Sequence, residues 1–277
     1  MHPTDAALHD HLSRLHGTLS GLIAIEARAI TMPKPSKMPL AVAMTDDLVP
    51  VLEDLYWFPF RNGIGEAPED EEELKPWLQR QLEKAVAVAA LLALLLRFHK
   101  RAVNYGGTIA LELLELAGKF SLTNSEYLGL IDERATMLAT PSAGSGTGDM
   151  SLIDTTVNNL AIAIPEARKS NDGVLAALGA YIAYRALTRS AAIATFEVPW
   201  GFAQGMGWTY QKNGVKRLMY DVNGEGCPLI CAPLNGRTMD ADNIPAELSL
   251  PRHSNCDCVH SPVLTGWTAP ATVWKGK

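Results

Sequence analysis

The chain has 277 residues, of which 47% are hydrophobic, so it can form one large folded domain or two smaller ones and is too apolar to be disordered. Its net charge of −6 excludes a protein that is basic overall and binds nucleic acid through that charge. Basic charge is only local, with seven basic and three acidic residues between Glu166 and Arg217. This segment is either a contact surface for DNA phosphates or an acidic protein, or an ordinary solvated face.

The first forty residues combine a periodic apolar pattern with a proline-rich stretch. Apolar side chains recur at spacings of four and three residues, which predicts a one-sided amphipathic helix. They are Leu8, Leu12, Leu15, Leu19, Leu22 and Ile23. Thr31 to Pro39 holds three prolines and is an extended linker. We interpret residues 1–40 as an amphipathic arm that docks on a partner, the alternative being that the arm packs on its own domain.

Residues 41–140 are predicted to form a helical domain. Its main helix is expected from Pro76 to Tyr105, where Gly106 and Gly107 follow as a stop signal. Within it, Ala85 to Leu96 is a run of twelve apolar residues, shorter than the roughly 20 needed to span a bilayer. We therefore expect no membrane contact, and we expect this run to be shielded on all sides, within the chain or against a partner.

The glycine-rich stretch from Thr140 to Gly148 marks a predicted domain boundary, and residues 149–277 form the second predicted domain. Its helices are expected to end before Pro199, with Glu197 either in a buried pair with Arg189 or on the surface. Glycines then recur at short spacing, and short strands are predicted at 215–222 and 259–264. The expected fold class is α+β, predominantly α-helical, with a small β-rich subdomain at the C-terminal end that is stapled by cysteines.

All four cysteines of the chain lie within thirty-two positions of this C-terminal end, as Cys227, Cys231, Cys256 and Cys258. His253 precedes the second pair by three residues. Thiolate and imidazole ligands in two close pairs suit a structural tetrahedral zinc ion, bound by all four cysteines or with His253 in place of one of them. Disulfides are the second interpretation, although residues 1–10 lack the apolar segment of a secretory signal, which predicts synthesis in the cytosol. Buried thiols without a partner are the third.

Three segments in order carry a resemblance to a known family. They are Asn213-Gly-Val-Lys-Arg-Leu218, Cys227-Pro-Leu-Ile-Cys231-Ala-Pro-Leu-Asn-Gly236 and Leu250-Pro-Arg-His253-Ser-Asn255-Cys256-Asp-Cys258. The order resembles the tailed-phage head morphogenesis family, the Mu F-like minor capsid proteins, over about Thr108 to Val263. Two features depart from that family: the first pair is spaced CxxxC instead of CxxC, and Asp257 stands where an arginine is usual.

The resemblance implies a virion component without catalysis. Such a protein sits inside the capsid near the portal vertex, after a cytoplasmic stage in the host, and assists head assembly, DNA packaging or DNA delivery. The implied partners are the portal protein, a capsid or scaffold protein, and packaged DNA bound without sequence specificity.

An enzyme is the alternative class, namely a zinc-dependent nuclease of the His-Cys type that acts on DNA. It would use His253 or His260 as general base and would need an open position on the metal. Four sulfur ligands would leave no such position, so the ligand count distinguishes the two classes. A helix-turn-helix regulator is a third class, which specific binding to duplex DNA would reveal.

Overall fold

The computed structural model describes residues 39–61, 64–84, 86–114, 116, 120–122, 125–140, 151–169, 173–222, 229–254 and 256–263. The predicted arm before Pro39 and the predicted ligand Cys227 lie outside these residues. The described helices are α2 (Pro39–Trp57), α3 (Glu71–Leu82), α4 (Val86–Leu113), α5 (Ser125–Ala139), α6 (Leu152–Arg168) and α7 (Val174–Lys212), with short 3₁₀ turns at Phe58–Phe60, Ile64–Glu66, Ala232–Leu234 and Ala246–Leu248. The strands are β1 (Arg217–Asp221), β2 (Thr238–Asp240) and β3 (Val259–Pro262).

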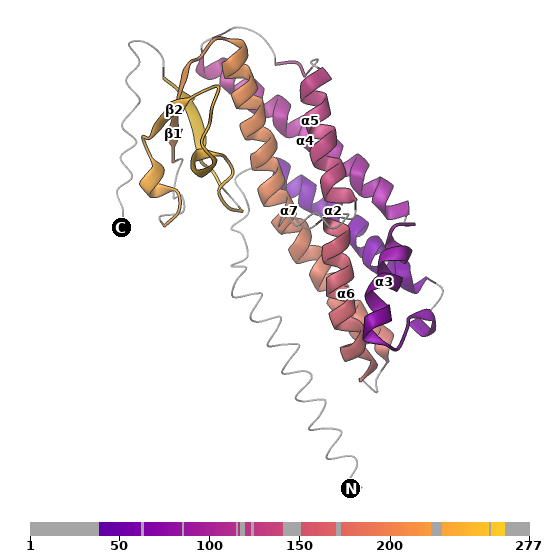
Figure 1. Cartoon of the computed structure of the whole chain (residues 1–277). Helices are drawn as coiled ribbons and strands as arrows, with labels where there is room; N and C mark the ends of the chain where they lie inside the picture. The colour runs from indigo at the N-terminus through magenta and orange to yellow at the C-terminus, as the bar shows by residue number, and fades with distance from the viewer. Residues whose placement is uncertain are drawn as a thin grey trace, which may run out of the picture.

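A helical bundle and a small sheet are joined by the length of α7 (Figure 1). The sheet is antiparallel with the order β2-β1-β3, and Tyr220 of β1 lies opposite His260 of β3. The expected fold class, mostly helical with a small β-rich end that carries the cysteines, is confirmed. Among the described helices, none has both the length and the apolar character to cross a bilayer.

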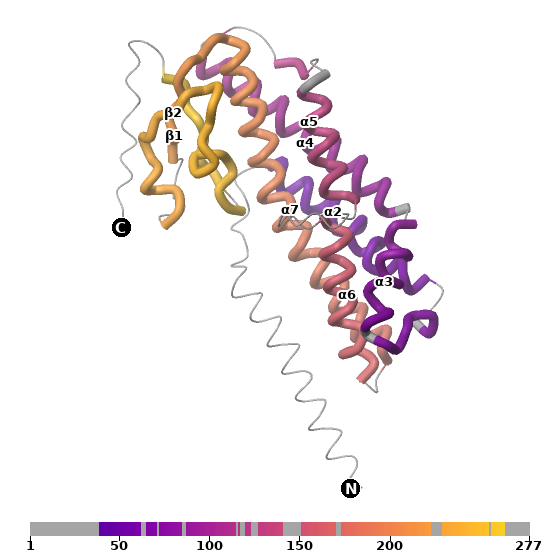
Figure 2. The backbone as a smooth tube through the Cα atoms, in the orientation of Figure 1, coloured from indigo at the N-terminus to yellow at the C-terminus, as the bar shows by residue number. Residues whose placement is uncertain are grey.

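Helix α7 continues without a break from the bundle to the sheet (Figure 2). Its 39 residues extend about 58 Å at 1.5 Å per residue. Leu178, Ile182 and Val198 on this helix belong to the main core, while Met206 and Tyr210 belong to a second core under the sheet. The main core also takes residues from both sides of the predicted boundary at 140–148, so the packing of the described residues is continuous across it.

The prediction that the helix ends before Pro199 is wrong, and Gly201, Gly205 and Gly207 lie inside α7, whereas Gly214 and Gly236 do lie in turns with positive φ. Pro199 lies inside α7, and Gly201 and Gly205 allow α7 to approach α4 closely. A Cβ atom on Gly205 would lie 2.0 Å from the carbonyl oxygen of Val103, and one on Gly106 would lie 2.0 Å from that of Phe202. Gly106 therefore serves helix contact and does not end α4, which runs on to Leu113.

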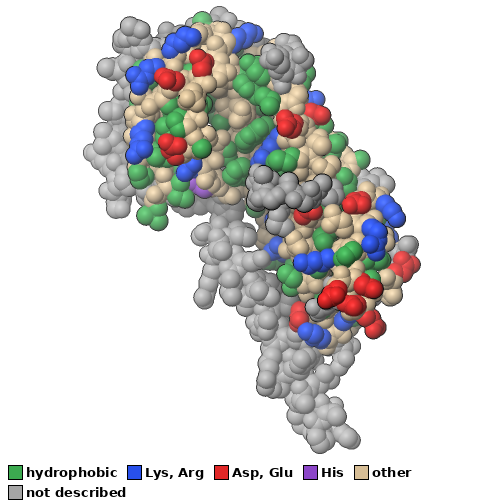
Figure 3. Space-filling view, in the orientation of Figure 1, with side chains coloured by type: hydrophobic (Ala, Val, Ile, Leu, Met, Phe, Trp, Pro, Cys, Tyr) green, Lys and Arg blue, Asp and Glu red, His purple; other side chains and the backbone are tan. Residues whose placement is uncertain are grey.

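The prediction of a single helix that begins at Pro76 is also wrong. There are two helices, because α3 ends at Leu82 and α4 begins at Val86. Helix α3 begins earlier than expected, where the Asp70 side chain accepts a hydrogen bond from the backbone N–H of Glu72 at 2.8 Å. Exposed acidic side chains gather over this end of the bundle in Figure 3. They are Glu66, Glu69, Asp70, Glu72 and Glu73.

The apolar run in α4 is not shielded on all sides by its own chain. Leu91, Leu94 and Leu95 are buried, but Ala89, Ala90 and Ala93 are exposed. The buried side of the run packs in the main core, and burial of its outer side against a partner stays a prediction.

Glu197 of α7 is buried, but its partners are not on α7. His99 Nε2 of α4 lies 3.0 Å from Glu197 Oε2, and Arg134 of α5 donates through Nη2 to Oε1 at 2.8 Å. The ring of Trp200 lies against both His99 and Arg134. Burial raises the pKa of the Glu197 carboxyl, but the hydrogen bonds from His99 and Arg134 outweigh it and hold the pKa below its ordinary value of 4.5. The expected pair with Arg189 is thus replaced by a link among three helices.

Substituting Gly205 by alanine should destabilise the protein by about 1–3 kcal/mol, because the new methyl group would overlap the backbone of α4. Gly207→Ala is the matched control on the same helix, since a Cβ atom there meets nothing within 4 Å. The control should stabilise the helix by up to about 1 kcal/mol. Denaturant unfolding of both variants measures the difference, and equal stabilities would contradict the close contact.

Replacing Glu197 by glutamine should cost roughly 3 kcal/mol, because the half-buried guanidinium of Arg134 loses its buried counter-charge. The folded-state pKa of Glu197 is lowered, so its contribution is present above the unfolded pKa and is lost as the pH falls through the folded value. The difference in free energy of unfolding between wild type and variant should therefore shrink in acid. Asp54→Asn, which removes the exposed pair with Arg61, is the control and should cost at most about 1 kcal/mol.

Candidate metal centre

Two loops and one strand bring the cysteines together beside the sheet. Cys231 immediately precedes the 3₁₀ turn Ala232–Leu234. Cys256 and Cys258 lie in the extended segment that leads into β3, where residues two apart point to the same side. Both are buried, and Asp257 between them is half-buried. The CxC spacing therefore delivers two sulfur atoms to one point.

The sulfur atoms of Cys231, Cys256 and Cys258 all lie within 4.8 Å of one another. All three residues are buried and none is in a disulfide. Around a tetrahedral ion with bonds of about 2.3 Å, neighbouring sulfurs are separated by about 3.8 Å. The cluster thus needs only a small contraction to enclose one metal ion, and it is compatible with a metal site.

His253 contributes a ring nitrogen at the edge of this cluster. Its Nε2 lies 3.2 Å from the sulfur of Cys231, and its Nδ1 lies 2.7 Å from the carbonyl oxygen of Ser254. Because a carbonyl only accepts, Nδ1 carries a proton, and in the neutral ring the lone pair is then on Nε2. A hydrogen bond that fixes the tautomer in this way is typical of histidines that bind metal through the other nitrogen.

The three thiols share one negative charge. The hydrogen bond from Cys258 is the main cause that lowers the pKa of the Cys256 thiol to about 5; backbone hydrogen bonds and the nearby His253 act in the same direction, and burial opposes them. Hydrogen bonding to Cys256, together with burial, raises the pKa of Cys258, and burial raises that of Cys231. Without metal, the cluster is therefore one thiolate and two thiols.

Tyr220 is a further member of the site that the sequence did not reveal. Its hydroxyl is buried, faces the sulfurs of Cys231 and Cys258, and has no well-oriented hydrogen bond among the described residues. Burial raises its pKa, and the neighbouring sulfurs raise it further. It is placed to donate to a thiolate. The alternation of Leu218 and Tyr220 toward one side of β1 is the only sequence signal for it.

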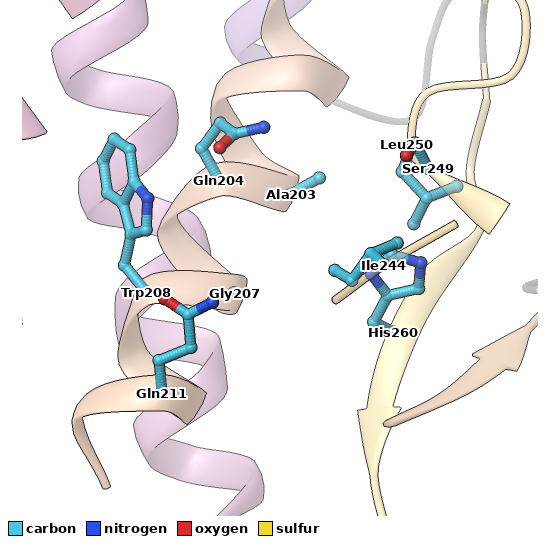
Figure 4. Close-up of a pocket in the computed structure, with 9 residues that line it drawn as sticks. All are labelled: Ala203, Gln204, Gly207, Trp208, Gln211, Ile244, Ser249, Leu250 and His260. Carbon is cyan, nitrogen blue, oxygen red and sulfur yellow. The ribbon is translucent and has the colours of Figure 1, made fainter. Parts of the chain in front are cut away.

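His260, the other proposed base, packs against the Tyr220 ring with 5.9 Å between the ring centroids, and its hydrogen-bond partner is a backbone carbonyl and not a cysteine sulfur. Its Nε2 donates to the carbonyl oxygen of Leu248 at 2.8 Å, and burial lowers its pKa. The ring borders a cavity of about 240 Å³ whose other wall is α7, with Gln204 and Gln211 across from it (Figure 4). Of the predicted ligands, Cys231, Cys256 and Cys258 are thus brought together, His253 touches one of them, and Cys227 lies outside the described residues.

Comparisons with protein-family models, with curated proteins and with solved structures find no match to this chain. The chemistry of the cluster is that of a site for a thiolate-preferring metal ion.

Metal binding should release a number of protons that identifies the fourth ligand. At pH 7, Cys231 and Cys258 each give up one proton, whereas Cys256 is already ionised. Two protons per Zn²⁺ ion are expected if the neutral His253 ring completes the site, and about three if Cys227 does. Titrating metal-free protein with Zn²⁺ beside an indicator dye counts them.

Two histidine variants test whether His253 is the fourth ligand. His253→Gln should weaken binding if the imidazole is the fourth ligand, while His260→Gln should leave the stoichiometry unchanged. Release of fewer than two protons, or two disulfides seen by mass spectrometry in protein purified under reducing conditions, would contradict the metal site.

Proposed function

We propose that the metal is a single structural zinc ion held by Cys231, Cys256 and Cys258, with either His253 or Cys227 as fourth ligand. Three thiolates and one imidazole or thiolate form a usual tetrahedral zinc site. The ion has its place in the small C-terminal core, where three of the buried residues are these cysteines. When bound, it cross-links the loop at Cys231 to the segment that enters β3.

We further propose that the chain is a phage minor head protein, a structural component of the virion associated with the portal vertex inside the capsid. The observation that carries this proposal is the convergence of the closing motif, His253 to Cys258, with Cys231 of the preceding motif at one buried point. These are the residues on which the resemblance to the Mu F-like proteins rests.

The protein's role in this proposal is binding, with the portal protein as main partner. Capsid or scaffold protein and packaged DNA, held without sequence specificity, are further partners. The exposed alanines of α4 and the long α7 offer extended helical surfaces for such contacts. The site of action is the capsid interior, reached from the host cytoplasm during assembly.

A nuclease of the His-Cys type is less well supported, because it needs both an open metal position and a base beside it. His253 Nδ1 donates to a backbone carbonyl, and its Nε2 faces a cysteine sulfur. His260 donates to Leu248 and borders a different cavity. Neither histidine is therefore placed as a free base next to the sulfurs.

Co-expression with the portal protein of the same phage tests the proposal. We expect the full chain to co-elute with the portal ring on size exclusion, and to leave duplex and single-stranded DNA uncut in the presence of Zn²⁺ or Mg²⁺. Each protein expressed alone sets the elution positions. Separate elution of the two proteins, together with metal-dependent cleavage of DNA, would contradict the proposal and support the nuclease.

A further inference from the structure

A groove of about 460 Å³ lies where the bundle meets the sheet. One wall comes from the end of α4 and the middle of α7, and the other from Asp221 and the segment 256–261. The volume falls in the range of roughly 300–1,000 Å³ that is common for binding pockets. Cys256 and Cys258 of the candidate metal centre are among its lining residues, so the groove lies directly beside that centre.

The helical wall of the groove exposes large apolar side chains. Tyr105 is 51% exposed and Leu113 is 46% exposed, although both are large and apolar and lie on the same helix. Ile109 between them is half-buried, and the Tyr105 ring packs against Phe202 of α7 at 5.4 Å. A continuous apolar strip of this kind is typical of a surface that binds an apolar segment.

The opposite wall is acidic. Asp221 and Asp257 both line the groove, and no lysine or arginine is among the described residues that line it. One oxygen of Asp221 accepts a hydrogen bond from the Ser261 hydroxyl at 3.1 Å. The groove therefore suits an occupant that is apolar along one side and carries basic residues.

The chain itself supplies such a segment at the rim of the groove. Pro39 and Leu40, where the described structure begins, are themselves lining residues, and Figure 1 shows α2 beginning beside α7 near the sheet. The 38 residues before them include the apolar stripe, defined as Leu8, Leu12, Leu15, Leu19, Leu22 and Ile23. Between that stripe and Pro39 lie three basic residues and one acidic residue, namely Arg28, Lys34, Lys37 and Glu26.

We propose that the apolar stripe of residues 8–23 docks in this groove of its own chain, with the basic residues of the linker beside Asp221 and Asp257. The fifteen residues from 24 to 38 can span up to about 50 Å, so the tether allows the stripe to fold back. A tether of this length holds the stripe at roughly millimolar effective concentration, which favours docking within one chain over binding in trans. This inference does not depend on the proposed function.

A photo-activated cross-linking residue at position 105 tests the docking in the full chain. Tyr105 is exposed, so the substitution should be tolerated. Irradiation should yield a product of monomeric mass in which position 105 is joined to a peptide from residues 8–23. The same probe at Leu113 should give the same peptide, whereas a probe at Ile162 of α6, which is 63% exposed and does not line the groove, should give none.

The double variant Leu15→Asp/Leu19→Asp is the second part of the test. It alters only the stripe, and we expect it to reduce the cross-link from position 105 by at least tenfold. It should also increase the hydrogen exchange of the α4 segment around Leu113. Absence of any cross-link to residues 1–38 from both probe positions would overturn the proposal. A product of dimeric mass would overturn it as well, because the stripe would then occupy the groove of a second copy.

Discussion

The close contact between α4 and α7 is the constraint on which the rest of the structure depends. Two helix backbones can approach this closely only where side chains are missing, and Gly106 and Gly205 supply those positions from opposite sides. The contact places the second half of α7 alongside α4. Met206 and Tyr210 thereby meet Ala110 and form the floor on which the sheet packs. The cysteine cluster is thus positioned by a helix contact made outside the sheet.

The buried carboxylate of Glu197 fixes the same pair of helices in one register. A single glutamate receives His99 from α4 and Arg134 from α5, so a slip of any of the three helices would leave a buried charge without a partner. The link lies two residues from Pro199, where α7 lacks a backbone donor. Packing of Trp200 against His99 and Arg134 adds to the link at this point. These contacts explain why α7 continues through a residue that usually ends a helix.

The sequence was informative where the signal is local and less so where it depends on a distant neighbour. The grouping of cysteines and the strands near 215–222 and 259–264 follow from composition and alternation, and the structure has β1 and β3 there. For Gly106 and Gly205, in contrast, the local sequence does not distinguish a glycine that ends a helix from one that lets a second helix pack closely. The partner of Glu197 was equally hidden, since Arg189 is near in sequence whereas His99 is 98 positions away. Tyr220 was missed because an alternating strand does not reveal what its inner side faces.

The small C-terminal core shows why a cross-link belongs at this place. Its strands have five, three and four residues, too few for a sheet to be stable by itself. Part of the missing stability comes from α4 and α7, through Ala110, Phe202 and Tyr210. The loops that carry the cysteines belong to the same small core and face these helices across a groove. In these loops the buried groups are Cys231, Cys256 and Cys258, which as free thiols pack only as small apolar side chains. One ion bound to all three would join the two loops that the short strands cannot hold, and folding of this end would then be coupled to metal binding.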